Sequence, residues 1–157
     1  MDEVGEDAAR YFYVRSSHRT EMNFDLEVAV QQSDENPVYY VQYAHARIAS
    51  IFRRAGLDPE TIKDVPPGDF APEERALLLE LFDFPRVVEG AATRREVHPL
   101  PTYLETLATR FHRFYTVHQV LVEDEGLRQR RLALCAATKN VLRNGLGLLG
   151  VNAPERM

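Results

Sequence analysis

The 157-residue sequence has a single cysteine, and this scarcity excludes two classes of site. Cys135 stands between Leu134 and Ala136 in an apolar stretch, with no second thiol for a disulfide and no partner at metal-ligand spacing. We therefore expect a buried, inert thiol in a protein of a reducing compartment. We expect no metal site.

Long apolar runs and a positively charged leader are also missing. No run approaches the roughly 20 apolar residues that a membrane-spanning helix needs. The first ten residues, MDEVGEDAAR, are acidic, whereas a secretory signal begins with positive charge. The sequence predicts a cytoplasmic protein that makes no contact with a membrane.

The usual catalytic patterns are absent as well. There is no glycine-rich phosphate loop after a strand, no His and Cys pairing at metal spacing, and no nucleophile elbow. Glu73 and Glu74 stand at a predicted helix start, where carboxylates interact favourably with the helix dipole. We expect no catalytic residue in this chain and no cofactor bound to it.

The net charge of −5 argues against nucleic-acid binding only if charge is averaged over the chain. Acidic residues crowd the first 27 positions, whereas arginines gather later. The basic residues of these later segments are Arg53, Arg54, Arg94, Arg95, Arg110, Arg113, Arg128, Arg130, Arg131, Lys139 and Arg143. Phosphate contacts depend on such local clusters, so a nucleic-acid partner stays open.

Helical periodicity dominates the sequence, and no apolar/polar alternation is long enough to seed a sheet. The pattern predicts an all-α bundle with helices over residues 7–14, 25–32, 37–54, 72–81, 85–94, 102–122 and 125–146. Pro37 suits the first position of its helix, and Asp34 or Asn36 can cap it. Gly56 suits its end. Residues 57–71 read as a connection with one possible turn at 59–63.

The helix expected at 37–54 has two distinct faces. Its core stripe consists of Val38, Val41, His45, Ile48 and Phe52. A histidine in such a stripe is more often a hydrogen-bonded core residue than a catalyst, and we interpret His45 in that way.

The second face of this helix carries aromatic rings and guanidinium groups within about 60° of one another. Its members are Tyr40, Tyr43, Arg47 and Arg54. Aromatic rings stack on unpaired bases and arginines pair with phosphates, so this face suits a single-stranded RNA loop. A second packing face in the bundle is the alternative.

The two later helices repeat this division between core and rim. The core stripe of the helix at 102–122 comprises Leu104, Leu107, Phe111, Phe114, His118 and Leu121, with Tyr115 at its border. On the last helix Arg128, Lys139 and Arg143 lie on one line outside the apolar surface. That line is either a solvated basic face or a phosphate-binding one.

Three segments carry a resemblance to a known family. The segment NPVYYVQYAHAR at residues 36–47 resembles the NPxYYxQYAHAR helix of arginyl-tRNA synthetases. DAARYF with FDLEVA, and the terminal LGVNAPERM, are similar to further stretches of the same family. Over essentially its whole length, the chain resembles the C-terminal DALR-type anticodon-binding domain of these class I enzymes.

The resemblance implies a helical bundle at residues 34–157 and an arm at 1–33 that joins a catalytic domain. The HIGH and KMSK-like motifs of that domain, which binds ATP with magnesium, are not in this sequence. The resemblance therefore implies arginine–tRNA ligase activity for a longer parent protein, with this fragment inactive alone. The implied partners are the anticodon stem-loop of arginine tRNA and the catalytic domain, in a monomer.

The resemblance also implies which residues meet the anticodon loop. The tRNA-binding candidates are Tyr40, Tyr43, Arg47, Tyr115 and Met157, with Arg54 and Arg143 added from the basic faces. Two alternatives remain at this stage. One is a helical protein-interaction domain without RNA binding, and the other is the related domain of another class I synthetase, such as the cysteine enzyme.

Overall fold

The structure is a computed structural model that describes residues 4–17, 25–63 and 65–157. Its helices are α1 (Glu6–Arg15), α2 (Leu26–Ala29), α3 (Pro37–Ala55), the 3-10 turn η1 (Pro59–Thr61), α4 (Pro72–Arg94), α5 (Pro99–Val117) and α6 (Glu125–Leu148). No strand occurs in these ranges, and the all-α prediction is confirmed. Within them, too, no helix combines the length and the apolar character needed to cross a bilayer.

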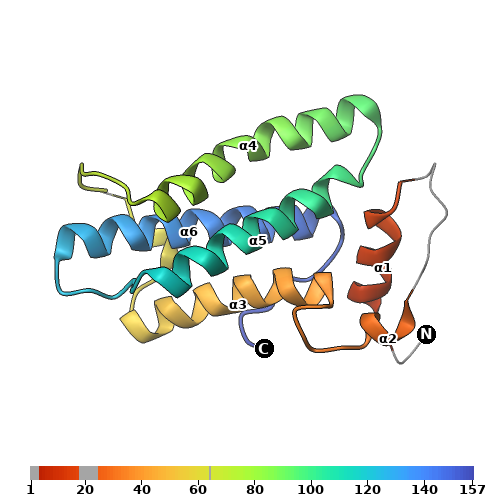
Figure 1. Ribbon diagram of the computed structural model, residues 1–157, viewed down its shortest axis with the longest axis horizontal. Coiled ribbons are helices and arrows are strands. Elements are labelled where there is room, and N and C mark those ends of the chain that lie inside the picture. The colour runs from red at the N-terminus through yellow and green to blue at the C-terminus, as the bar shows by residue number, and fades with distance from the viewer. Residues whose placement is uncertain (1–3, 18–24, 64) are drawn as a thin grey trace.

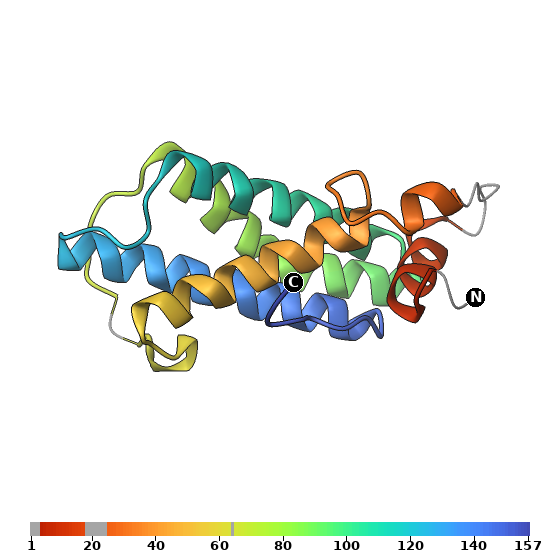
Figure 2. The same cartoon turned by 90° about the horizontal axis from the view of Figure 1, so that it is seen from below.

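The four long helices run along the length of the molecule, and α1 stands across one end of them (Figure 1). Helices α5 and α6 each pack against all three other long helices, and α5 also contacts α1. Seen from below, the chain after α6 turns back and ends beside the middle of α3 (Figure 2).

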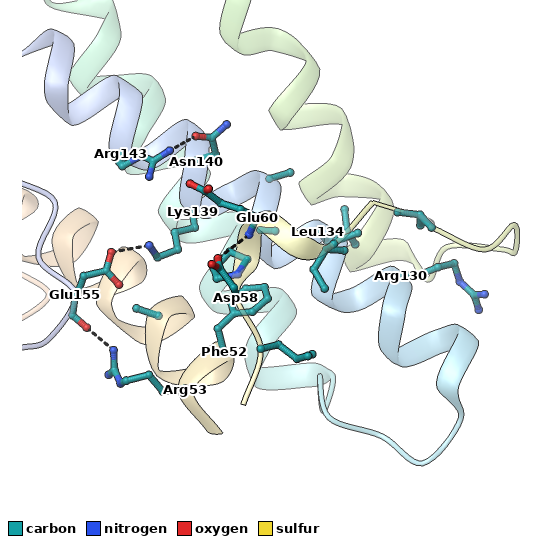
Figure 3. A pocket seen from close by; sticks show the side chains of 18 of the residues that line it. Phe52, Arg53, Asp58, Glu60, Arg130, Leu134, Lys139, Asn140, Arg143 and Glu155 are labelled. Atoms are coloured by element: carbon teal, nitrogen blue, oxygen red, sulfur yellow. Dashed lines mark hydrogen bonds and ion pairs between the residues drawn. The ribbon is translucent and has the colours of Figure 1, made fainter. Parts of the chain in front are cut away.

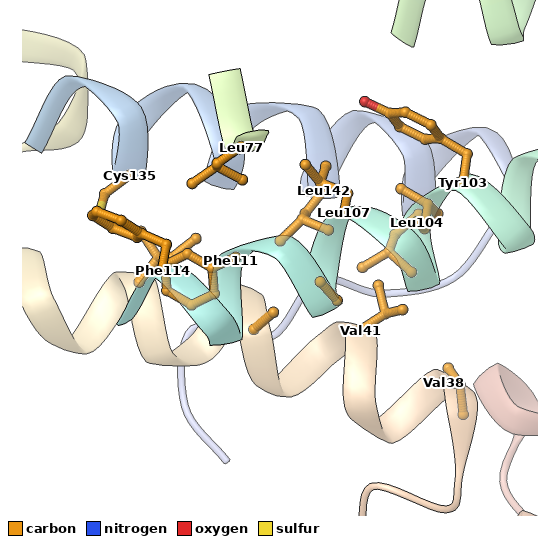
Figure 4. Packing of buried hydrophobic residues seen from close by; sticks show 14 of the residues in the cluster. Val38, Val41, Leu77, Tyr103, Leu104, Leu107, Phe111, Phe114, Cys135 and Leu142 are labelled. Carbon is orange, nitrogen blue, oxygen red and sulfur yellow. The ribbon is translucent and has the colours of Figure 1, made fainter. Parts of the chain in front are cut away.

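Apolar side chains from α3, α4, α5 and α6 interdigitate between the helices (Figure 4). Leu77, Phe111 and Phe114 are fully buried there. Cys135 is also buried, and burial raises the pKa of its thiol to about 12, so the prediction of an inert thiol is confirmed. The core fills the space between the helices, which leaves the outer faces of α3 and α5 to form a surface site.

The core face predicted for α3 is present in the structure. All five residues of its core stripe are buried, and His45 is completely inaccessible. A hydrogen bond of 2.9 Å joins His45 Nδ1 to the carbonyl oxygen of Pro154, which confirms a core histidine with a partner. The helix ends at Gly56, whose φ of 65° is left-handed.

Asn36 occupies the N-cap position of α3, but its side chain does not cap the helix. Its amide instead donates to the carbonyl oxygens of Ala29 and Gln31. These bonds hold the segment after α2 against the start of α3. Helix α2 ends at Ala29, so the prediction of a helix over residues 25–32 was too long.

The two helices predicted at 72–81 and 85–94 are one helix, α4, and this prediction was wrong. Pro85 lies inside the helix, where it lacks the N–H that would bond to Leu81 and costs about 3 kcal/mol relative to alanine. Packing of α4 along α5 outweighs that local preference.

Helix α5 begins at Pro99 and ends at Val117, whereas residues 102–122 were predicted. His118 and Leu121 therefore lie in a loop and not on the core stripe of the helix. Tertiary contacts hold this loop: Arg131 donates to the carbonyl oxygen of Gln119, and His118 lies 3.2 Å from a carboxylate oxygen of Glu73. A pattern within one segment cannot show such contacts from α4 and α6.

Candidate nucleic-acid interface

Arg47 is the centre of a stack of rings on the outer face of α3. Its guanidinium carbon lies 4.5 Å from the ring centroid of Tyr43 and 5.0 Å from that of Tyr115 on α5. Nη2 donates to the Tyr43 hydroxyl at 2.7 Å, and Nη1 lies 3.3 Å from Nδ1 of His112. Arg54 donates to the Tyr115 hydroxyl at 3.1 Å. The stack thus joins α3 to α5 through cations and aromatic rings.

A groove of about 510 Å³ opens beside this stack. We call it the arginine groove, and the residues that line it are Tyr43, Ala46, Arg47, Ser50, Arg53, Arg54, Tyr115, Arg156 and Met157. Four of the nine are arginines, and none has an acidic side chain. The groove therefore attracts anions although the whole chain carries a net charge of −5.

The C-terminal tail supplies one side of the arginine groove. Met157 is 51% exposed and lies in the groove with Arg156, more than a hundred positions after Arg47 in the sequence. Five of the seven predicted site residues are thus brought together: Tyr43, Arg47, Arg54, Tyr115 and Met157.

Tyr40 is not among the residues that line the groove. Its ring packs on His112 with centroids 4.7 Å apart, and its hydroxyl donates to Thr109 at 3.4 Å. It lines a separate hollow next to α1, with Phe12 and Glu105. The structure thus separates Tyr40 from the other aromatic candidates.

Arg143 lies on the other side of Arg53 from the groove. Its guanidinium donates to the side chain of Asn140 at 2.8 Å and lines a larger cavity of about 1030 Å³ (Figure 3). Arg53 lines both the cavity and the groove, so the two hollows are neighbours. Arg143 is therefore next to the groove without lining it.

Lys139 departs from the basic line expected on the last helix. Its side chain is only 11% exposed, and Nζ contacts a carboxylate oxygen of Glu155 at 2.6 Å. Arg128 and Arg143 are accessible to solvent, whereas Lys139 is neither part of a solvated face nor free for a phosphate. Helical spacing alone could not show that the tail would cover it.

Sequence reasoning missed the roles of His112, Arg53 and Arg156. His112 packs against both Tyr40 and Tyr43, and burial together with the charge of Arg47 lowers its pKa to about 4. It is therefore neutral near pH 7, and it donates no competing positive charge to the stack. The helical position of His112 beside Tyr115 was the available signal, but nothing in the sequence placed Arg156 near α3.

The arrangement offers aromatic faces, guanidinium groups and a soft thioether in one open groove. Such groups stack on bases and contact phosphates, which is how single-stranded loops of RNA are held. The side chains that line the groove include neither a carboxylate nor an imidazole. The geometry is therefore suited to holding a single-stranded loop of RNA.

Comparison with known proteins agrees with this geometry. Residues 41–157 match the family described as the DALR anticodon binding domain. The chain is 50% identical to an arginine–tRNA ligase of Bordetella avium over 98% of its own length but only 28% of that protein. It is similar to the arginyl-tRNA synthetase structure of Thermus thermophilus, with a TM-score of 0.82, 36% identity and coverage of 99% of this chain and 27% of that one. For the Plasmodium falciparum arginyl-tRNA synthetase the TM-score is 0.80, with 25% identity and coverage of 96% and 26%.

Proposed function

The chain belongs to the DALR anticodon-binding domain family, and from that membership we propose that its arginine groove binds the anticodon loop of arginine tRNA. The observation that carries the proposal is the meeting of Tyr43, Arg47 and Tyr115 with Met157 in one groove that no acidic side chain lines. Bases stack against the rings, and the exposed arginines contact the backbone phosphates.

The chemistry of aminoacylation belongs to a longer protein in this proposal. The chain spans about 28% of the relative from Bordetella avium, and that relative is named as an arginine–tRNA ligase. The described residues bring together no group of three or more His, Cys, Asp or Glu side chains able to hold a metal ion. We therefore assign ATP, magnesium and the transfer of arginine to a catalytic domain in the same cytoplasmic polypeptide, with this chain as the tRNA-positioning part.

Selectivity is the main test of the proposal. Labelled anticodon stem-loops of an arginine tRNA and of a non-arginine tRNA are titrated with the protein at 50 and 200 mM salt, with fluorescence anisotropy as the readout. We expect tighter binding of the arginine stem-loop at both concentrations, and weaker binding of both RNAs at the higher salt because counterions are released on binding. Equal affinity for the two stem-loops would contradict the proposal.

Arg47→Lys tests the groove directly. Lysine keeps the positive charge but lacks the planar group that stacks between Tyr43 and Tyr115, so we expect about tenfold weaker binding of the arginine stem-loop. Arg86→Lys on the exposed face of α4 is the matched control and should bind as the wild type does. If Arg47→Lys lowers the melting temperature but leaves the affinity unchanged, the stack is a packing face and the protein-interaction alternative gains.

A further inference from the structure

The tail that supplies Met157 is fastened to α3 at successive points. The side chain of Gln42 donates to the carbonyl oxygen of Asn152 at 2.9 Å, and His45 meets that of Pro154 at the same distance. Arg53 donates to the carbonyl oxygen of Glu155 at 2.8 Å. Since the contacts advance along both segments together, the tail runs alongside α3 in the same direction.

Glu155 is the residue at which the tail is held from two helices at once. Its carboxylate contacts Lys139 of α6 at 2.6 Å, while its backbone carbonyl accepts from Arg53 of α3 (Figure 3). Burial works against ionisation of this carboxyl, but the hydrogen bond from Lys139 and the charges of Lys139 and Arg53 keep its pKa below the usual value. The ion pair is therefore intact near neutral pH.

Glu155 stands where the tail passes from the larger cavity to the arginine groove. Glu155 lines the larger cavity, whereas the next two residues, Arg156 and Met157, line the arginine groove. Among the described residues, the last hydrogen bonds and ion pair along the tail are those of Glu155. The course of the final two residues is thus set at this point.

We propose that Glu155 is a positioning residue of the RNA site: clamped between Lys139 and Arg53, it directs Arg156 and Met157 into the arginine groove. Glu155 acts through its neighbours and does not itself touch the RNA. The inference rests on the proposed function, because it assigns a role within the same groove.

A purely electrostatic role and a positioning role of Glu155 predict opposite effects of Glu155→Gln on the affinity for RNA. Removing a carboxylate next to a polyanion strengthens binding if only long-range charge matters. Loss of the clamp weakens binding, because the tail then has to be ordered when RNA binds. The sign of the change in affinity therefore separates the two roles. Asp83→Asn on α4 is the charge-matched control, since it also removes one carboxylate from an ion pair, in this case with Arg86 and away from the groove.

The experiment measures the affinity for the arginine stem-loop and the methyl spectrum of the methionines. The sequence has three methionines, so ¹³C-methyl labelling gives three signals, and Met157→Ala identifies that of Met157. In Glu155→Gln we expect the Met157 signal to move to the sharp, averaged position of an unstructured methionine. We expect about fivefold weaker binding, while Asp83→Asn binds at least as tightly as the wild type.

Two further variants distinguish positioning from a general loss of stability. Combining Glu155→Gln with Met157→Ala should weaken binding no more than the stronger single change, because both remove the same contact. Lys139→Met with Glu155→Gln leaves the net charge unchanged and no unpaired buried ammonium, and it should reproduce the loss if the single variant folds poorly.

Unchanged or tighter binding by Glu155→Gln, or an unaltered Met157 signal, overturns the positioning role while leaving the proposed function intact. Additive losses in the double variant with Met157→Ala overturn it as well. If the wild-type protein does not prefer the arginine stem-loop, the proposed function fails, and the Met157 spectrum still reports whether Glu155 orders the tail.

Discussion

Arg47 keeps its charge available because its hydrogen-bond partners are the neutral Tyr43 hydroxyl and the His112 ring. A carboxylate in either place would cancel the charge that attracts a phosphate. Protonated His112 would instead repel Arg47 across 3.3 Å. The neutral imidazole is thus a condition for the stack, and burial provides it by lowering the pKa of His112 to about 4.

His112 makes stability depend on pH in a defined window. The unfolded chain protonates this imidazole near pH 6.5, while the folded chain does so near pH 4, so the unfolded state binds more protons between these values. Stability should therefore rise with pH from 4 to 6.5, by at most roughly 3 kcal/mol from this residue. Urea unfolding at pH 4.5, 5.5 and 7.5 measures this change in the free energy of unfolding.

His112→Asn is the control for that window, because asparagine offers an acceptor near Nδ1 but does not titrate. Carboxylates and His45 contribute equally to the pH dependence of stability in the wild type and in the variant. The difference in stability between the two proteins therefore isolates the contribution of His112. A difference that stays constant from pH 4.5 to 7.5 would show that His112 is not held neutral by folding.

At the level of the helices, α5 and α6 approach closely because residue 145 has no side chain. A Cβ on Gly145 would lie 2.5 Å from Cδ2 of Leu104, whose side chain is fully buried. A Cβ on Gly147, in the same helix, would meet nothing within 4 Å. A side chain would therefore be crowded at residue 145 and unhindered at residue 147.

Alanine at these two positions should have opposite effects. Gly145→Ala should destabilise the protein by about 1–3 kcal/mol through overpacking, despite the better helix propensity of alanine. Gly147→Ala should stabilise it by up to about 1 kcal/mol, because only the propensity changes. Thermal unfolding followed by circular dichroism compares the pair. Equal shifts of the two melting temperatures would argue against a tight α5–α6 contact at Gly145.

Helix α4 contains a proline that its packing tolerates. Pro85 is exposed, so replacing it with alanine disturbs no buried contact and restores one backbone donor. Pro85→Ala should raise the free energy of unfolding by about 1–3 kcal/mol. The same melting experiment tests it, and a lower melting temperature would indicate that the proline shapes α4 for its packing on α5.

Across the whole molecule, one buried ion pair joins three separate parts of the chain. Arg131 of α6 contacts Glu74 of α4 at 2.6 Å, and it also donates to the carbonyl oxygen of Gln119 in the loop after α5. Glu74 is 2% exposed and accepts from the N–H of Ala71 as well. The pair therefore sets how the ends of these three helices meet.

Breaking this pair from one side should be costly. Arg131→Met leaves the Glu74 carboxylate buried without its cation, and we expect a loss of about 3–5 kcal/mol in the free energy of unfolding. Glu74→Gln combined with Arg131→Met should recover most of it, since glutamine is uncharged and can still accept from Ala71. Denaturant unfolding of the single and double variants checks this, and equal stability of the two would contradict it.

The sequence by itself determined the class of fold and most of the local surface chemistry. Helical spacing is a property of one segment, so the buried stripe of α3, the core role of His45 and the shared face of Tyr43 and Arg47 could all be predicted. Gly56 as the end of α3 was predictable for the same reason, since its left-handed conformation is a local preference of glycine. Family likeness supplied the anticodon loop as the ligand, which remains a proposal.

Only the tertiary structure decided what depends on contacts between distant segments. Packing on α5 carries α4 through Pro85, and contacts from Glu73 and Arg131 turn the chain out of α5 at His118. The return of the tail along α3 buries Lys139 and places Met157 beside Arg47. Helical periodicity reports which side of a segment is apolar but not which segment will cover it. The groove, its lack of acidic side chains and the contacts of Glu155 therefore appear only when the chain is folded.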